Sequence, residues 1–211
     1  SARGSETMTD TLRESQNIIN IRRKLDGLES KVIKNNARYN FEMETSTQGW
    51  VVDKSNDNNQ NTHLKNIEYK SKIGNRALEI NFNNLTKGIN SELHVNTFFP
   101  EEFTTLNEQQ EMMLMVYSFV GCPIIYSGQN IKTEIISKTK KDIKIKLFIK
   151  YYGEGDKLYK ISSEEYFFSD DESKTIEWKV PDTFSNPITQ IGYSISSDEQ
   201  ASGEVLINYL D

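Results

Sequence analysis

Residues 143–152 read Ile-Lys-Ile-Lys-Leu-Phe-Ile-Lys-Tyr-Tyr, a run in which apolar and charged side chains largely alternate. Successive side chains of a β-strand point to opposite faces. Leu147 and Ile149 therefore share one face of this run, whereas Lys146 and Lys150 share the other. This period of two is typical of an antiparallel sheet that buries one face and leaves the other in water. The run is predicted to be such a strand.

The same short-period pattern occupies most of the chain from residue 39 onward. Polar turns separate the predicted strands, and an Asn-rich polar loop is expected over residues 53–63. The prolines fall at or between strand ends, where a missing N–H group does least harm. Short strands divided by polar turns predict an all-β, antiparallel sandwich. Besides 143–152, the predicted strands are 77–82, 92–98, 111–120, 131–138, 159–168, 175–180, 188–196 and 204–210.

Residues 9–38 differ in composition from the rest of the chain and are predicted to form an N-terminal helix and linker. Apolar residues recur there at spacings of three and four, which is the pattern of an amphipathic α-helix. The stripe is too short to indicate a coiled coil. The predicted helix packs on the sandwich, on an upstream domain of the parent chain or on a second copy. Residues 1–8 read as the remnant of an expression tag. The apolar stripe of the predicted helix consists of Ile18, Ile21, Leu25, Leu28 and Val32.

The charge balance argues against a nucleic-acid-binding protein. The 211 residues carry a net charge of −6, whereas nucleic-acid binding needs a basic face. A lysine-rich stretch does occur, but we interpret it as a solvated strand face with a Lys-rich turn. The longest apolar run, residues 112–126, is too short to span a bilayer, so no membrane insertion is expected. The lysine-rich stretch contains Lys132, Lys138, Lys140, Lys141, Lys144, Lys146 and Lys150.

No group of residues has the spacing of a catalytic site. Neither histidine, His63 or His94, belongs to a metal-ligand motif. Cys122, the only cysteine, lacks the flanking residues of a catalytic thiol and cannot form an internal disulfide. Acidic pairs such as Glu101-Glu102 lie in polar stretches typical of solvated turns, unlike the enclosed carboxyl pair of a glycosidase. The protein is predicted not to be an enzyme, and a hidden hydrolytic site is the alternative.

Four stretches resemble a known family of binding domains. Residues 39–42 (Tyr-Asn-Phe-Glu) open a strand, and Gly49-Trp50 follows a polar turn. Residues 74–80 contain a Gly-x-x-Ala-Leu pattern, and Leu210-Asp211 ends the chain. Together they resemble the jelly-roll carbohydrate-binding modules of secreted glycan-active enzymes, over residues 39–211. The resemblance implies a jelly-roll β-sandwich and a non-catalytic carbohydrate-binding domain of a larger bacterial protein. It also implies a secreted or cell-surface location.

Aromatic side chains are the best candidates for ligand binding in such a domain. An aromatic ring attracts the C–H bonds of a sugar, and nearby amides and charges orient the sugar hydroxyls. The tyrosines are expected to line a polysaccharide site on one sheet face or in the end loops, with core packing as the alternative for each. Trp50 and Trp178 are assigned to the core. The predicted ligand-binding residues are Tyr117, Tyr126, Gln129, Tyr152 and Tyr193.

The resemblance also implies a structural calcium ion. In many of these jelly rolls, a glutamate of the opening strand and the aspartate that ends the last strand bind Ca²⁺ together. The matching residues are Glu42 and Asp211. Calcium takes about six to eight oxygen ligands, so backbone carbonyls near Gly74 and Asn75 would complete the set. Two surface carboxylates without a metal are the alternative.

A structural or interaction domain is the alternative function. Related opening motifs occur in the tails of insecticidal crystal toxins and beside ADP-ribosylglycohydrolase-type domains. Residues 123–129 and the closing Leu-Asp look most like the latter setting. In that role the sandwich would support a neighbouring domain of a multidomain protein, and the predicted helix would mediate docking.

Overall fold

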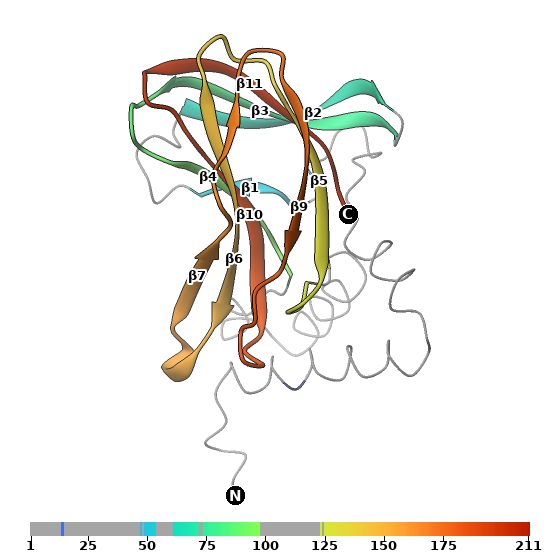
Figure 1. Cartoon of the computed structure of the whole chain (residues 1–211), viewed down its shortest axis with the longest axis vertical. Helices are drawn as coiled ribbons and strands as arrows, with labels where there is room; N and C mark the ends of the chain where they lie inside the picture. Colours follow the sequence, from blue (N-terminus) through green and yellow to red (C-terminus); the bar gives the residue numbers. More distant parts are fainter. Residues whose placement is uncertain are drawn as a thin grey trace, which may run out of the picture.

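The computed structural model describes residues 14, 47, 49–53, 61–71, 74–97, 123 and 125–211. Within them the chain forms two β-sheets packed face to face, in which every strand pairs antiparallel to its neighbours (Figure 1). The predicted all-β antiparallel sandwich is confirmed. The predicted helix over residues 9–38 and the predicted strand over residues 111–120 lie outside the described residues.

The two sheets differ in size. The five-stranded sheet contains, in spatial order, β2 (Thr62–Ser71), β3 (Gly74–Leu85), β11 (Ala201–Leu210), β5 (Asn130–Ser137) and β9 (Ser173–Lys179). The six-stranded sheet contains β1 (Val51–Val52), β4 (Ser91–Asn96), β10 (Ile188–Ser196), β6 (Ile143–Tyr152) and β7 (Leu158–Ser162), and β8 (Tyr166–Phe168) also pairs with β6. A short 3-10 turn, η4 (Glu154–Asp156), connects β6 to β7.

The chain crosses repeatedly from one sheet to the other. Strands β3, β5, β9 and β11 belong to the five-stranded sheet, whereas β4, β6 and β10 belong to the six-stranded sheet. Figure 1 shows β6 and β10 side by side, with β7 along the free side of β6. Strands β10 and β6 are therefore interior strands, and residues from distant parts of the sequence meet on their surface.

The core lies between the sheets and follows from the period-two pattern. Ile145, Leu147 and Ile149 of β6 point inward, where they are almost completely buried. They face apolar side chains of the other sheet, including Ile80 of β3 and Ile207 of β11, in a single core cluster. Burying one such side chain stabilises the folded state by roughly 1.5–3 kcal/mol. Burial of these apolar side chains is therefore the main interaction that holds the two sheets together.

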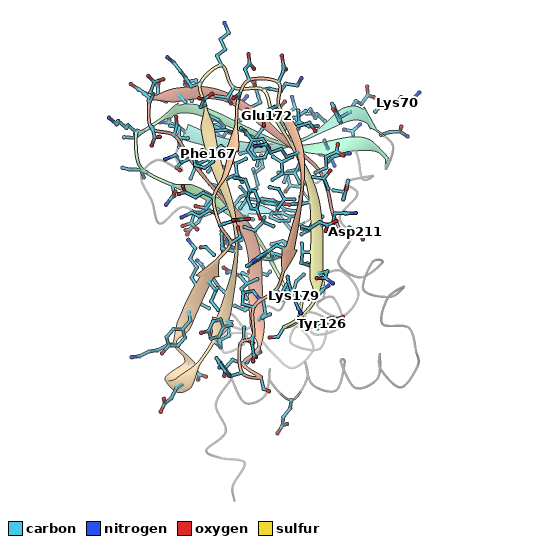
Figure 2. The ribbon with its side chains drawn as sticks, in the orientation of Figure 1. Lys70, Tyr126, Phe167, Glu172, Lys179 and Asp211 are labelled. Carbon is cyan, nitrogen blue, oxygen red and sulfur yellow. The ribbon has the colours of Figure 1, made fainter. Side chains whose placement is uncertain are left out.

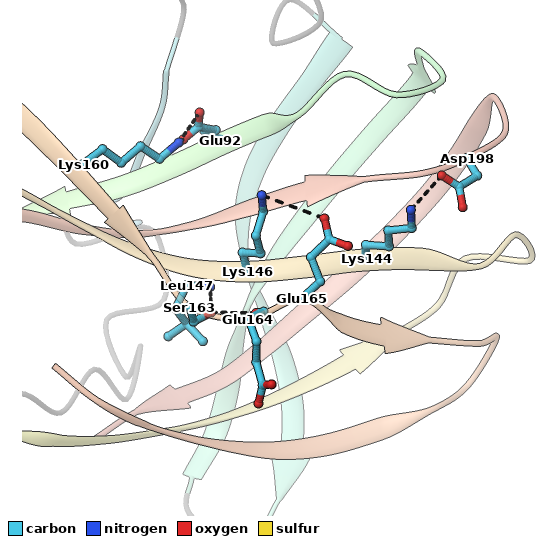
Figure 3. A network of polar contacts seen from close by, with 9 residues as sticks. All are labelled: Glu92, Lys144, Lys146, Leu147, Lys160, Ser163, Glu164, Glu165 and Asp198. Carbon is cyan, nitrogen blue, oxygen red and sulfur yellow. Dashed lines mark hydrogen bonds and ion pairs between the residues drawn. The ribbon is translucent and has the colours of Figure 1, made fainter. Parts of the chain in front are cut away.

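Most predicted strands agree with the structure, and β6 and β10 agree at both ends. The predicted strand 159–168 is wrong in one respect, because it consists of β7 and β8 with a break between them. The break occurs where Leu147 N–H donates to the Ser163 hydroxyl instead of to a backbone carbonyl (Figure 3). Ser163 N–H in turn donates to the Leu147 carbonyl, and the next residues leave the sheet.

Strand β2 is absent from the predicted strands, and the polar loop predicted over residues 53–63 overlaps only its first two residues. The apolar residues of β2 do not share one face, which hides the period of two. Leu64 packs against the main core, whereas Ile67 and Tyr69 pack against a second small cluster. That cluster contains Ala77, Ile136 and Leu206, which are also buried.

Candidate functional site

Tyr193, one of the predicted ligand-binding residues, belongs to the core. Its side chain is 1% exposed, and its ring centroid lies 5.5 Å from that of Trp50. The Tyr193 hydroxyl lies 2.7 Å from the Thr133 hydroxyl, which donates to the Tyr209 carbonyl. Burial raises the pKa of the phenol above its ordinary value, and the bond to Thr133 opposes that shift. A ring enclosed in this way cannot stack on a sugar, so the structure corrects the prediction for Tyr193.

Tyr126 and Gln129 form the two ends of a tight turn. The buried Gln129 amide oxygen accepts a bond from the Tyr126 backbone N–H, and the Gln129 backbone carbonyl accepts one from Val180 N–H. Figure 2 shows Tyr126 at the same end of the sandwich as Lys179. Tyr126 and Tyr152 are buried as well. The ligand-binding prediction for these three residues stays a prediction, because Phe148 on the outer face of the six-stranded sheet is equally buried, and Tyr117 lies outside the described residues.

The calcium prediction stays a prediction. Glu42 lies outside the described residues, so the pair that the resemblance implies cannot be tested. Asp211 is held by backbone bonds in both directions with Lys132, at N···O distances of 2.7 and 2.8 Å. Within the part of the chain that the structure describes, no group of three or more His, Cys, Asp or Glu side chains could hold a metal ion.

A different surface has the properties of a binding site, namely the outer face of the six-stranded sheet. This face consists of the side chains of β4, β10, β6 and β7 that alternate with the core residues and point away from the five-stranded sheet. Its central members are Glu92, His94, Gln190, Gly192, Ser194, Lys146, Phe148, Lys150 and Lys160. Phe148 is 0% exposed, although it does not belong to the core cluster.

Phe148 lies flat across β10 because residue 192 has no side chain. Gly192 pairs with Phe148 on one side and with His94 on the other. A Cβ atom at residue 192 would overlap Cζ of the Phe148 ring and the Leu93 carbonyl oxygen. A glycine inside a strand often marks such a close approach. Gly192 therefore places an aromatic ring in the middle of the outer face, beside His94.

Two lysines lie near this ring. The Lys160 ammonium is 4.6 Å and the Lys150 ammonium 5.7 Å from the Phe148 ring centroid, distances at which a cation is attracted to an aromatic face. Lys160 also bonds both carboxylate oxygens of Glu92, at 2.6 and 2.8 Å (Figure 3). The ring therefore lies near a glycine, two lysine ammonium groups and an ion pair of the outer face.

Three buried polar atoms of the outer face have no hydrogen-bond partner within the described structure. They are Nδ1 of His94, Oε1 of Gln190 and Oγ of Ser194. Gln190 and Ser194 are two residues to either side of Gly192 on β10, and His94 pairs with Gly192 across the sheet. Native proteins leave few buried polar groups unsatisfied, because each costs roughly 1–3 kcal/mol. This cluster of polar atoms therefore marks the place where a polar ligand would be accommodated best.

Burial lowers the pKa of His94, and the positive charge of Lys150 lowers it further. The carboxylates of Asp53 and Glu92 act in the opposite direction. The net result favours the neutral imidazole, whose two nitrogens are one donor and one acceptor. His94 can therefore accept a hydrogen bond from a hydroxyl group as well as donate one.

Sequence reasoning missed this site, although two signals were present. In residues 147–149, Leu-Phe-Ile, three apolar residues occur in succession, so Phe148 places a large apolar side chain among the lysines of β6. Gly192 lies in the middle of a strand, where glycine is unfavourable. Each signal is weak alone, and only the register of β6 and β10 shows that the two residues pair.

Comparisons with known proteins support the fold. A carbohydrate-binding module of the β-sandwich superfamily, described as promiscuous in its specificity, aligns with 83% of this chain and 61% of its own at 14% identity and a TM-score of 0.56. The CBM22-1 xylan-binding domain of Paenibacillus barcinonensis Xyn10C aligns with 82% of this chain and 89% of its own, at 8% identity and a TM-score of 0.49. A Clostridium thermocellum structure containing CBM22-1 and GH10 modules, complexed with xylohexaose, aligns at 14% identity and a TM-score of 0.45.

This last alignment includes 80% of the present chain but only 27% of the Clostridium thermocellum protein. No family model and no curated protein matches the sequence. Because the alignment with the β-sandwich module has a TM-score of 0.56, the fold is that of a carbohydrate-binding-module-like β-sandwich, as the resemblance implied. In the described segments, no helix is long and apolar enough to cross a membrane.

Proposed function

We propose that this protein is a non-catalytic carbohydrate-binding domain, and that the outer face of its six-stranded sheet binds a polysaccharide. The observation that carries the proposal is the group of unpartnered buried atoms around Phe148, on His94, Gln190 and Ser194. A sugar offers hydroxyl groups that both donate and accept, so one ligand can satisfy all three. The similarity in fold to a carbohydrate-binding module agrees with this role.

Each member of the proposed site has a distinct task. The Gln190 amide oxygen accepts a bond from a sugar hydroxyl, whereas the Ser194 hydroxyl can donate or accept. The Phe148 ring is 0% exposed, so it can offer an apolar surface to the C–H bonds of a sugar only after the side chains over it move. Lys160 lies over that ring, so stacking requires its flexible side chain to rotate away.

The wider setting of the domain is also part of the proposal. The opening and closing motifs support a place within a larger, secreted bacterial protein. Tyr117, which lies outside the described residues, is retained as a proposed stacking residue, in contrast to the buried Tyr193.

The test is a glycan array, followed by isothermal titration of the best ligand with Gln190→Leu. This change keeps the side-chain volume and removes the amide. We expect binding to weaken about 5- to 10-fold, the equivalent of roughly 1–1.4 kcal/mol, because one hydrogen bond is lost. Asn81→Leu on the other sheet is the matched control, since Asn81 is also half-buried. Equal loss in both variants would contradict this location, and an array without any response would contradict the function.

An interaction domain is the second candidate function, and Phe184 favours it. Its side chain is 81% exposed, whereas large apolar side chains are usually covered. Hydrogen bonds hold the loop that carries Phe184: the Thr183 hydroxyl is bonded to the Ser127 hydroxyl and donates to the Asn186 carbonyl. Phe184 and Ser185 both have positive φ angles, 52° and 65°. If no glycan binds, sedimentation of the native chain and of Phe184→Ser would test whether this residue mediates self-association.

A further inference from the structure

The charges on the outer face of the six-stranded sheet are not evenly compensated. Four lysines of β6 and β7 belong to this face: Lys144, Lys146, Lys150 and Lys160. Three have carboxylate partners, since Lys144 pairs with Asp198 at 2.8 Å, Lys146 with Glu165 at 3.9 Å and Lys160 with Glu92 at 2.6 Å (Figure 3). Within the described structure, Lys150 is the one member of this set without a carboxylate partner.

Lys150 lies directly opposite one of the unpartnered residues, Gln190, while Lys146, which has a carboxylate partner, lies opposite Ser194. Lys150 pairs with Gln190 across β6 and β10, and its positive charge adds to the effect of burial in lowering the pKa of the His94 imidazole. Its ammonium is 5.7 Å from the centroid of the Phe148 ring. A cation, a buried amide oxygen and an aromatic ring therefore meet at one place on the sheet.

Protection of a sheet edge does not account for this lysine. Edge strands often carry lysines that prevent pairing with other chains. Strand β6, however, pairs with β10 on one side and with β7 and β8 on the other, so it has no free edge along these residues. The whole chain has a net charge of −6, so a locally uncompensated cation also runs against the overall balance.

We propose that the outer face selects anionic glycans, and that Lys150 binds the acidic group of the sugar. This inference rests on the proposed function and adds the ligand class to it. A monoanionic substituent, a carboxylate or a sulfate ester, would compensate the single excess charge. The hydroxyls of the same sugar would satisfy Gln190, Ser194 and His94. A neutral sugar would instead cover Lys150 without compensating its charge, and a desolvated, unpaired charge is costly.

The experiment compares three forms of one ligand by isothermal titration of the intact chain. Galacturonate oligosaccharides supply the carboxylate, the same oligosaccharides reduced to primary alcohols supply a neutral match, and a sulfated form supplies the alternative anion. We expect at least one anionic form to bind about tenfold more tightly than the neutral form at low salt. Higher salt should reduce that advantage, because it screens exposed charges.

Lys150→Gln then tests the residue. We expect it to abolish the advantage of the anionic form and to leave affinity for the neutral form within about twofold. Lys132→Gln is the matched control, because it changes net charge equally but lies on the five-stranded sheet. Equal binding of anionic and neutral forms, unaffected by Lys150→Gln, would overturn this inference and leave carbohydrate binding intact. Binding of no form, with a silent glycan array, would overturn both.

Discussion

Lys160 and Glu92 form an ion pair that spans two intervening strands of the six-stranded sheet. Glu92 belongs to β4 and Lys160 to β7, and β10 and β6 lie between them. The pair crosses the sheet beside Phe148, whose ring centroid is 4.6 Å from the Lys160 ammonium. Its side chains are 20% and 34% exposed, so it is better shielded from water than most surface ion pairs. We therefore expect this ion pair to contribute to the stability of the outer face and to limit access to the ring.

We expect Glu92→Gln to lower the free energy of unfolding by about 1 kcal/mol, because a partly buried lysine loses its counter-charge. The same change should tighten binding of anionic glycans, since a second lysine becomes available. Urea denaturation and isothermal titration measure the two effects. Glu165→Gln is the control: its pair with Lys146 is long, at 3.9 Å, and should contribute less than about 0.5 kcal/mol. A similar loss in both variants would show that the Lys160 pair has no special role.

Gly192→Ala should destabilise the protein by about 1–3 kcal/mol, the usual cost of overpacking. The added methyl group would overlap the Phe148 ring and the Leu93 carbonyl oxygen. Rotation of the ring can relieve the first overlap, but the second is with the backbone of β4, so the paired strands must shift as well. Urea denaturation measures the loss, and glycan binding should weaken in parallel because the ring is displaced. An unchanged free energy of unfolding would mean that the ring is not held against β10.

Ser194→Ala should separate stability from binding. The Ser194 hydroxyl is buried without a partner, so its removal relieves a desolvation cost. We expect the free energy of unfolding to stay constant or to rise by up to about 1 kcal/mol, while glycan affinity falls severalfold. Thermal melting with and without ligand measures both quantities. Loss of stability without loss of affinity would assign Ser194 to packing and remove it from the proposed site.

The sequence contained enough information for the layers of the fold but not for the site. Alternation in residues 143–152 and 188–196 predicted β6 and β10 with their ends, because one side of each strand is apolar. The same alternation cannot show which strands become neighbours. Tyr193 and Phe148 therefore could not be told apart: the tyrosine faces the core, and the phenylalanine lies on the lysine side of its strand.

Residue type was a poor guide to position at this site. The tyrosines are predicted ligand-binding residues because their rings can stack on a sugar, but the Tyr193 ring is buried and its hydroxyl is satisfied internally by Thr133. The unpartnered polar atoms instead belong to Gln190, Ser194 and His94, which are ordinary residues for the outer face of a sheet. Their importance depends on burial and on missing partners, and neither property can be read from a single sequence.

His94 should make stability depend on pH between about 7.5 and 5.5. Burial lowers its pKa in the folded protein below the value of 6.5 that applies to the unfolded chain, and the nearby Lys150 adds to this shift, while Asp53 and Glu92 oppose it. As the pH falls, the unfolded chain therefore takes up a proton before the folded protein does. The stabilising contribution is complete above about pH 6.5 and is lost as the pH falls toward the folded pKa.

We therefore expect the urea midpoint to fall between pH 7.5 and 5.5, and to fall less in His94→Gln. His63→Gln provides the matched control, because His63 is exposed on β2. The lowered pKa of Glu172 should not contribute in this window, because the ordinary carboxyl value of 4.5 already lies below it. If His94→Gln retained the full pH dependence of the native chain, the imidazole would not be the titrating group. An anionic glycan that restored the urea midpoint at pH 5.5 would not change this conclusion, because a bound ligand stabilises the folded state at any pH.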